Sequence, residues 1–107
     1  MSEIVRCMDR WERLIVLAED RWVDHILTRR PEFAGQQAVL EATLTDPTFV
    51  NHDRSRPDRE VFYRPSPLPY PFGGLLIRVV VQFRGSGEII TAHLIARPHP
   101  KETRKWP

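Results

Sequence analysis

The chain has 107 residues, of which 41% are hydrophobic and 28% charged, and its formal net charge is +2. This length allows one domain with a single core and is too short for two domains. The composition excludes a disordered chain. No apolar run approaches the roughly 20 residues of a membrane-spanning helix, and the first residues lack a secretory leader pattern. We therefore expect a soluble, cytoplasmic protein.

The first half of the chain carries mainly helical periodicity. Residues 12–18 form a short branched apolar run that favours a strand, with a helix as the alternative. A helix is expected over 19–30, where acids stand at the start, arginines stand at the end, and four apolar residues share one stripe: Trp22, Val23, Ile26 and Leu27. Pro31 ends it, and a second helix is expected from about Gly35 to Thr45.

The second half of the chain predicts a sheet. The pattern changes to alternation after Pro47, with short strands at 49–50 and 60–64. Four prolines make residues 65–74 an extended, flexible loop, and a basic tail follows from 97 to 107. We therefore expect a single domain over 1–107 with its core at about 12–95.

A β-hairpin is the clearest local signal, with strands at 75–83 and 88–95 and a four-residue loop between them. This loop length predicts a register in which the apolar faces of the two strands coincide; its pairs are Phe83 with Glu88, Val81 with Ile90, Val79 with Ala92, Val80 with Thr91, and Arg78 with His93. The last two pairs lie on the face turned away from the helices. That open face of the sheet is expected to be polar and basic.

Three cationic residues follow one side of the first predicted helix. Arg21, His25 and Arg29 are spaced four residues apart, so they stack along the helix. Like charges at this spacing repel, and an anionic partner would offset that cost. The alternative is an ordinary solvated helix face with a histidine at its margin.

A second group of functional candidates lies on the open sheet face. It comprises Arg78, Thr91 and His93, joined by Tyr63 and Arg64 from the preceding strand. A ribonuclease without a metal needs a base for the 2′-hydroxyl proton, an acid for the leaving 5′-oxygen and a cation for the phosphorane. Histidines titrate near neutrality and arginines bind phosphate, so these residue types suit the reaction. The alternative is a half-exposed sheet with ordinary polar residues outside.

Other kinds of site lack their usual patterns. His52, Asp53 and Asp58 have no second ligand set at fixed spacing, so no metal site and no cofactor are expected. The sequence has no phosphate-binding glycine loop before a helix and no nucleophile elbow. The tail combines cations with Trp106, which could follow a phosphate backbone or be an ordinary polar terminus.

Several short motifs resemble the phage-associated nucleases grouped as barnase/EndoU/colicin/RelE-like. They span about residues 12–95 in the family's order and are Trp22-Val23-Asp24-His25-Ile26-Leu27, Arg29-Arg30-Pro31-Glu32, Thr43-Leu44, Asp46-Pro47, Val50, Arg59, Phe62-Tyr63-Arg64, Val79-Val80-Val81 and Ile90-Thr91-Ala92. The resemblance implies an α+β domain with two N-terminal helices packed on a four- to five-stranded antiparallel sheet, and RNA as substrate. It points to His25, the strand from Arg59 to Arg64, and Thr91 as the functional core. The family usually has a histidine at the position of Arg30 and an aromatic residue at that of His93.

These observations together predict a metal-independent endoribonuclease that cleaves by 2′-hydroxyl transesterification, as a toxin or a phage or mobile-element effector. The expected catalytic residues are His25, His93, Thr91, Arg64 and Arg78, with substrate contacts from Arg21, Arg29, Arg30 and Tyr63. The expected partners are RNA, including tRNA or ribosome-bound RNA, and an antitoxin or inhibitor protein, with no membrane. The alternative function is a non-catalytic module of the same fold that binds RNA or protein.

Overall fold

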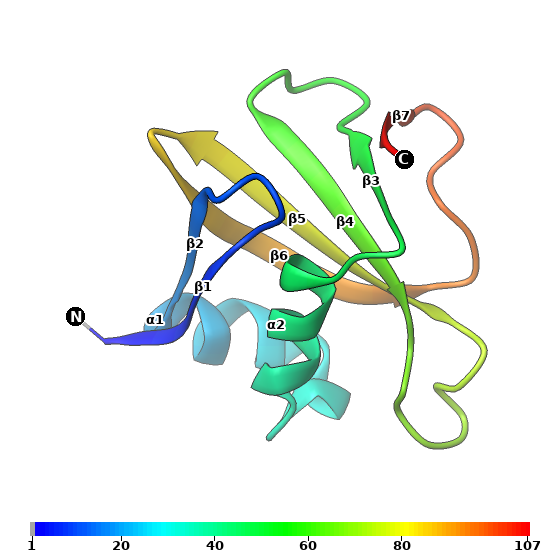
Figure 1. Ribbon diagram of the computed structural model, residues 1–107. Coiled ribbons are helices and arrows are strands. Elements are labelled where there is room, and N and C mark those ends of the chain that lie inside the picture. The colour runs from blue at the N-terminus through cyan, green and yellow to red at the C-terminus, as the bar shows by residue number, and fades with distance from the viewer. Residues whose placement is uncertain (1) are drawn as a thin grey trace.

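A computed structural model describes residues 2–107 and shows one curved sheet with the helices against its concave face (Figure 1). The seven strands lie in the order β1-β2-β6-β5-β4-β3-β7. In chain order the elements are β1 (Glu3–Met8), β2 (Leu14–Ala18), α1 (Glu19–Arg21), a π-helical segment (Trp22–Leu27), a 3-10 turn (Pro31–Phe33), α2 (Gln37–Thr45), β3 (Phe49–His52), β4 (Arg59–Pro65), β5 (Leu76–Arg84), β6 (Ser86–Ile95) and β7 (Thr103–Trp106).

The expected α+β arrangement of two N-terminal helices on a four- to five-stranded antiparallel sheet is wrong. The helices follow two strands, the sheet has seven strands, and it is mixed because β2 runs parallel to β6. The predicted strands at 49–50 and 60–64 correspond to β3 and β4, and the 12–18 run is β2. The additional strands β1 and β7 are the two edges of the sheet, and each has only one neighbour to bury it.

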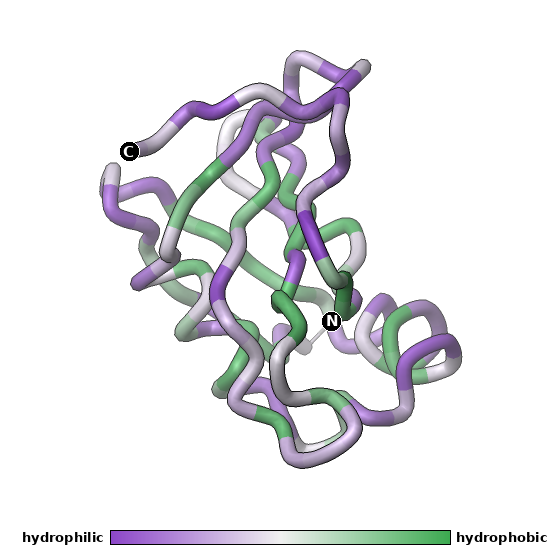
Figure 2. The backbone as a smooth tube through the Cα atoms, turned by 90° about the vertical axis from the view of Figure 1, so that its right-hand side faces the viewer, coloured by the Kyte–Doolittle hydropathy of each residue, from purple (hydrophilic) through white to green (hydrophobic). Residues whose placement is uncertain are grey.

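The hydrophobic core lies between the concave face of the sheet and the helices. Trp22 and Ile26 from the first helix, with Leu40 and Leu44 from α2, are buried against it. The sheet contributes inward-facing residues at every second position of its strands, which include Ile15, Leu17, Phe62, Ile77, Val79 and Val81. Figure 2 shows the resulting pattern, with green hydrophobic stretches along the central strands and purple hydrophilic ones along loops and the C-terminal segment.

The sheet curls so that the β1–β2 turn reaches the far strands. Arg13 in that turn donates hydrogen bonds of 2.9 and 2.8 Å to the carboxylate of Glu60 on β4. Trp11 meets Trp106 of β7 edge to face, with ring centroids 6.5 Å apart. The two edges of the sheet therefore approach each other at one end, and the other end is filled by α2.

The β5–β6 hairpin turns more tightly than the sequence predicted. Arg84 pairs with Ser86 around Gly85, which has the φ of +83° that favours glycine. The expected pairs of Phe83 with Glu88 and Val81 with Ile90 are therefore wrong, and the register is displaced by one residue near the tip.

A β-bulge restores the expected register farther along β6. Val81 pairs with Ile89 but Val80 pairs with Thr91, so Ile90 is the extra residue. Beyond it the predicted pairs of Arg78 with His93 and of Val79 with Ala92 are confirmed. The bulge thus turns Thr91 and His93 onto the open face while Ile89, nearer the tip, stays in the core.

The first predicted helix forms, and it packs beside β6. α1 continues directly into the π-helical segment, whose wider turns accommodate a hydrogen bond from the Thr28 hydroxyl to the Val23 carbonyl five residues earlier. Arg21 donates to the carbonyl of Ile90 at the bulge, with 3.1 Å between Nη1 and the oxygen. No helix within residues 2–107 is long and apolar enough to cross a membrane.

Candidate active site

Two adjoining pockets cross the open face of β5 and β6 and reach the first helix. The larger, of about 320 Å³, we call the loop pocket; it is lined by Asp53, Arg54, Ser55, Arg56, Arg59, Arg78, Val80, Thr91, His93, Ile95 and His99. The smaller, of about 240 Å³, we call the helix pocket; it is lined by His25, Ile26, Arg29, Arg30, Thr91, Ala92 and His93. Because Thr91 and His93 line both, the two pockets form one continuous basic groove.

The helix pocket lies where β2 no longer pairs with β6. β2 pairs with β6 only at Ile15 with Gly87 and Val16 with Glu88. Beyond these pairs the side of β6 is free, and the helix that carries His25 lies along it. This packing brings His25 and His93 to one pocket, which the sequence alone did not settle.

His93 is the most strongly perturbed histidine of the groove. Burial, together with the positive charges of Arg78 and Arg30, lowers its pKa from 6.5 to about 4, although Glu102 acts in the opposite direction. The imidazole is therefore neutral at pH 7 and can accept a proton.

His25 lines the helix pocket and is only partly buried. Its pKa is lowered by burial and by the neighbouring charges of Arg29 and Arg21, which disfavour an additional positive charge. Arg29 and Arg30 line the same pocket, whereas Arg21 lines a neighbouring hollow with Asp20 and Asp24 and is bonded to β6.

Arg78 is held by a buried polar network. Its Nε donates to the Tyr63 hydroxyl at 3.0 Å, and its Nη2 lies 2.5 Å from a carboxylate oxygen of Glu102. The other Glu102 oxygen accepts hydrogen bonds from Tyr63 at 2.6 Å and from Asn51 at 3.1 Å, and the carboxylate side chain is 0% exposed. Burial and Glu102 raise the pKa of Tyr63 to about 12. Tyr63 is thus a fixed neutral donor, and the Arg78 charge is compensated.

Arg64, an expected catalytic residue, lies on the other face of the sheet. It pairs with Ile77, whereas its neighbour Tyr63 pairs with Arg78 on the open face. Consecutive residues of a strand point in opposite directions, so the two could not share a site. The Arg64 guanidinium instead binds the carbonyl and the side-chain carboxylate of Asp46, the latter at 2.9 Å.

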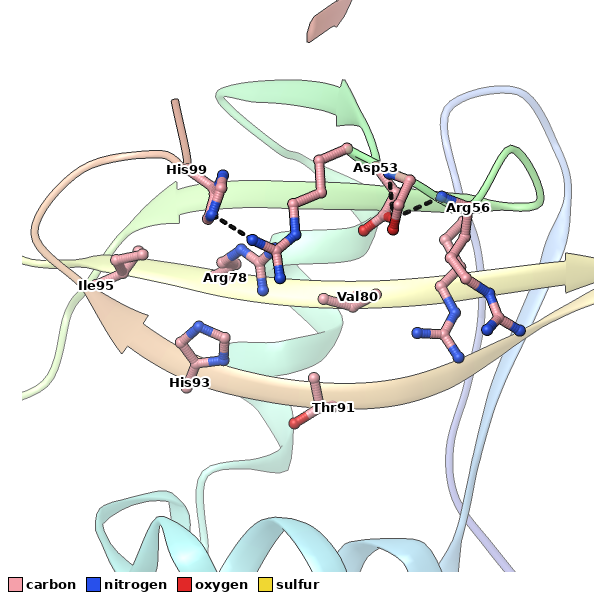
Figure 3. Close-up of a pocket in the computed structure, with 11 residues that line it drawn as sticks. Asp53, Arg56, Arg78, Val80, Thr91, His93, Ile95 and His99 are labelled. Carbon is pink, nitrogen blue, oxygen red and sulfur yellow. Dashed lines mark hydrogen bonds between the residues drawn. The ribbon is translucent and has the colours of Figure 1, made fainter. Parts of the chain in front are cut away.

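The loop pocket also contains residues that the sequence analysis did not assign to the site. They are Arg54 and Arg56 from the β3–β4 loop and His99 from the segment between β6 and β7. Arg59 at the start of β4 also lines the pocket, and it belongs to the strand to which the family resemblance points. Figure 3 shows Arg56 and His99 at the rim of the pocket, above the side chains that rise from β5 and β6. Alternation from Tyr63 back through Val61 predicts Arg59 on the open face; no local signal marks the loop residues.

The β3–β4 loop is fixed in shape by Asp53. Its carboxylate accepts backbone N–H bonds from Ser55 at 3.1 Å and Arg56 at 2.9 Å (Figure 3). Burial would raise the pKa of Asp53, but these hydrogen bonds outweigh it and lower the pKa. The Oδ2 atom of Asp53 thus fixes the turn from which Arg54 and Arg56 project.

The groove combines two neutral imidazoles, a hydroxyl and several cations along one path. Such a surface can bind a polyanion and move protons at neutral pH. Within residues 2–107 no group of three His, Cys, Asp or Glu side chains could hold a metal ion. Comparison of the chain with protein-family models, with curated protein sequences and with solved structures found no match.

Proposed function

We propose that this chain is a cytoplasmic, metal-independent endoribonuclease that cleaves RNA by attack of the 2′-hydroxyl on the adjacent phosphate. The observation that carries the proposal is the meeting of His25 and His93 in one pocket with Arg29 and Arg30. Base, acid and phosphate-binding cations are the three requirements of the reaction. The motif resemblance to barnase/EndoU/colicin/RelE-like nucleases supports the same activity, as a toxin or a phage effector that an antitoxin protein would restrain.

Proton transfer is assigned to the two histidines. Neutral His93 accepts the 2′-hydroxyl proton while the 2′-oxygen attacks phosphorus and the bond from phosphorus to the 5′-oxygen breaks. Protonated His25 then donates to that leaving oxygen. The products are a 2′,3′-cyclic phosphate and a 5′-hydroxyl end.

Substrate binding itself would prepare His25 as the acid. Besides burial, it is Arg29 and Arg21 that lower its pKa in the free protein. A phosphate bound beside Arg29 in the helix pocket offsets the charge of that arginine, so the pKa of His25 rises when RNA occupies the groove. Arg29 and Arg30 then stabilise the phosphorane, and the Thr91 hydroxyl donates to a phosphate oxygen.

Two arginines take different roles from those expected. Arg78 is the cross-strand neighbour of His93 and is neutralised by Glu102, so we assign it to positioning the base. Arg64 has no part in the groove, because it lies on the other face.

One observation favours the alternative of a non-catalytic RNA-binding module. In the free protein the pKa values of both His25 and His93 are lowered, so the groove holds cations but no protonated acid. A binding module needs only the cations and predicts salt-sensitive binding without product.

The direct test incubates the protein with total RNA, tRNA and intact ribosomes in excess chelator. Parent, His25→Ala and His93→Ala proteins are compared with His52→Ala, because His52 is exposed at the end of β3 and lines neither pocket. We expect fragments with 2′,3′-cyclic phosphate ends from the parent and from His52→Ala, and a loss of at least about 100-fold in both groove variants. If the protein binds every RNA but cleaves none, the endoribonuclease proposal is rejected in favour of a non-catalytic RNA-binding module.

A further inference from the structure

The loop pocket holds more positive charge than its surroundings compensate. Arg54, Arg56 and Arg59 reach it from one loop and the start of β4. Asp53 is the one carboxylate in its lining. Its Oδ2 accepts from the backbone of the turn, and its single negative charge, which acts on Arg59, cannot balance three arginines. The Arg56 guanidinium has no side-chain partner among residues 2–107, and Arg59 donates to the neutral amide oxygen of Gln82 at 3.1 Å.

The segment between β6 and β7 borders the loop pocket and contributes His99 to its lining. The chain leaving β6 must return to β7 at the opposite edge of the sheet, and its 96–102 segment does so past the open face (Figure 1). Glu102 ties this segment to Arg78, Tyr63 and Asn51. His99 faces the Arg54 guanidinium, with 2.7 Å between the two nitrogens. These contacts hold the segment in place beside the loop pocket.

The floor of the pocket suits the non-ionic part of a nucleotide. Val80 on β5 and Ile95 on β6 lie beneath the arginines. Val80 belongs to a small apolar cluster on this face, and Ile95 packs against that cluster. A volume of about 320 Å³ is comparable to that of one nucleotide unit. The pocket thus combines a cationic rim with an apolar floor.

We propose that the loop pocket binds the terminal phosphate monoester of an RNA chain, with the end nucleotide on Val80 and Ile95. A monoester carries between one and two negative charges at pH 7, whereas an internal diester carries one, so a cluster of uncompensated arginines discriminates in its favour. This inference rests on RNA being the partner, as proposed above, and adds that the protein selects phosphorylated ends and engages RNA close to them.

The test measures binding without cleavage. Fluorescent 2′-O-methyl oligoribonucleotides of one sequence, which lack the attacking hydroxyl, carry a 5′-phosphate, a 3′-phosphate or hydroxyls at both ends. The fluorophore is placed internally, and dissociation constants are measured at about 150 mM salt. Two proteins accompany the parent: the double variant Arg54→Gln with Arg56→Gln, and the double control Arg6→Gln with Arg84→Gln, whose arginines are exposed and line neither pocket.

We expect one phosphorylated end to bind the parent and the control at least tenfold more tightly than the hydroxyl oligonucleotide, and the loop variant to lose this preference. Which phosphate is preferred identifies the polarity of the bound chain. Equal binding of all three oligonucleotides, or a preference that survives in the loop variant, would overturn the inference. Phosphate selectivity without cleavage of ordinary RNA would instead reject the proposed catalysis and keep the pocket.

Discussion

At the level of single residues, His93 links the groove to pH. Its pKa of about 4 in the folded protein lies below the value of 6.5 for a free histidine, so the unfolded chain binds the proton more readily. The stabilisation from the neutral ring is therefore complete above about pH 6.5 and is lost as the pH falls toward 4. Because the side chain is only partly buried, the loss is no more than about 3 kcal/mol.

We predict that the parent loses stability more steeply than His93→Gln between pH 7 and pH 4.5. Urea unfolding at several pH values measures both slopes, and His52→Gln serves as the control because its side chain is exposed. Parallel curves for parent and His93→Gln would mean that the imidazole is solvated in the native state.

Glu102 makes a second prediction at this scale. Its fully buried carboxylate balances Arg78 and accepts from Tyr63 and Asn51. Glu102→Gln leaves Arg78 buried with no counter-charge, and we expect a loss of about 3 kcal/mol in the free energy of unfolding. The exposed Glu41→Gln should change it by less than about 0.5 kcal/mol. Equal effects of the two substitutions in urea unfolding would show that the network contributes little to stability.

Part of this residue-level picture was predictable from sequence. Strand alternation and the hairpin register placed Arg78, Thr91 and His93 on one face, because those relations are local. The same alternation, applied to Tyr63 and Arg64, would have separated them. Glu102 could not be assigned, since its partners lie in β3, β4 and β5, and only the complete fold brings them together.

At the level of elements, the β5–β6 hairpin depends on a close approach at Gly87. A Cβ atom there would lie 2.8 Å from Phe83 Cε1 and 3.0 Å from side-chain carbons of Ile15 and Val81. These neighbours belong to two strands, β2 and β5, so none can move without disturbing the core.

Gly87→Ala should therefore destabilise the protein by about 1–3 kcal/mol through overpacking. Gly73→Ala is the matched control, because its added Cβ would only meet the Leu68 carbonyl at 3.5 Å and its φ is not positive. Thermal and urea unfolding compare the two variants. A neutral Gly87→Ala would mean that β2 can draw away from β6.

The existence of most elements followed from the sequence, whereas their arrangement did not. Periodicity located both helices and the strands from β2 to β6, because each has enough residues to show its pattern. β1 and β7 were not predicted, and at β7 the four residues Thr103–Trp106 carry three polar side chains. The parallel pairing of β2 with β6 joins segments about 70 positions apart, and no local pattern specifies such a contact.

For the molecule as a whole, the ion network of the β1–β2 turn holds the curled sheet together. Arg13 binds the buried carboxylate of Asp9 at 2.7 Å as well as Glu60, and Lys105 of β7 lies 3.4 Å from Glu60. Segments from both edges and the middle of the sheet thus share one set of charges.

Arg13→Gln should lower the free energy of unfolding by about 3 kcal/mol, because it leaves Asp9 unpaired in a buried position. Arg6→Gln removes an arginine from an exposed pair with Glu3 and should cost less than about 1 kcal/mol. Urea unfolding distinguishes the two, and a similar small loss in both would show that apolar contacts alone close the sheet.

The extra residue at the Ile90 bulge decides which side chains of β6 face the groove and which face the core. Ile89 faces the core and His93 faces the groove although four positions separate them, a spacing that a regular strand would place on one side. Removing or adding one residue between them would exchange the two faces of β6, sending an imidazole inward and isoleucine or alanine out. The arrangement of this groove thus depends on the number of residues in β6 as well as on their identity. Insertion or deletion of a single residue would abolish the site although every functional residue is still present in the sequence.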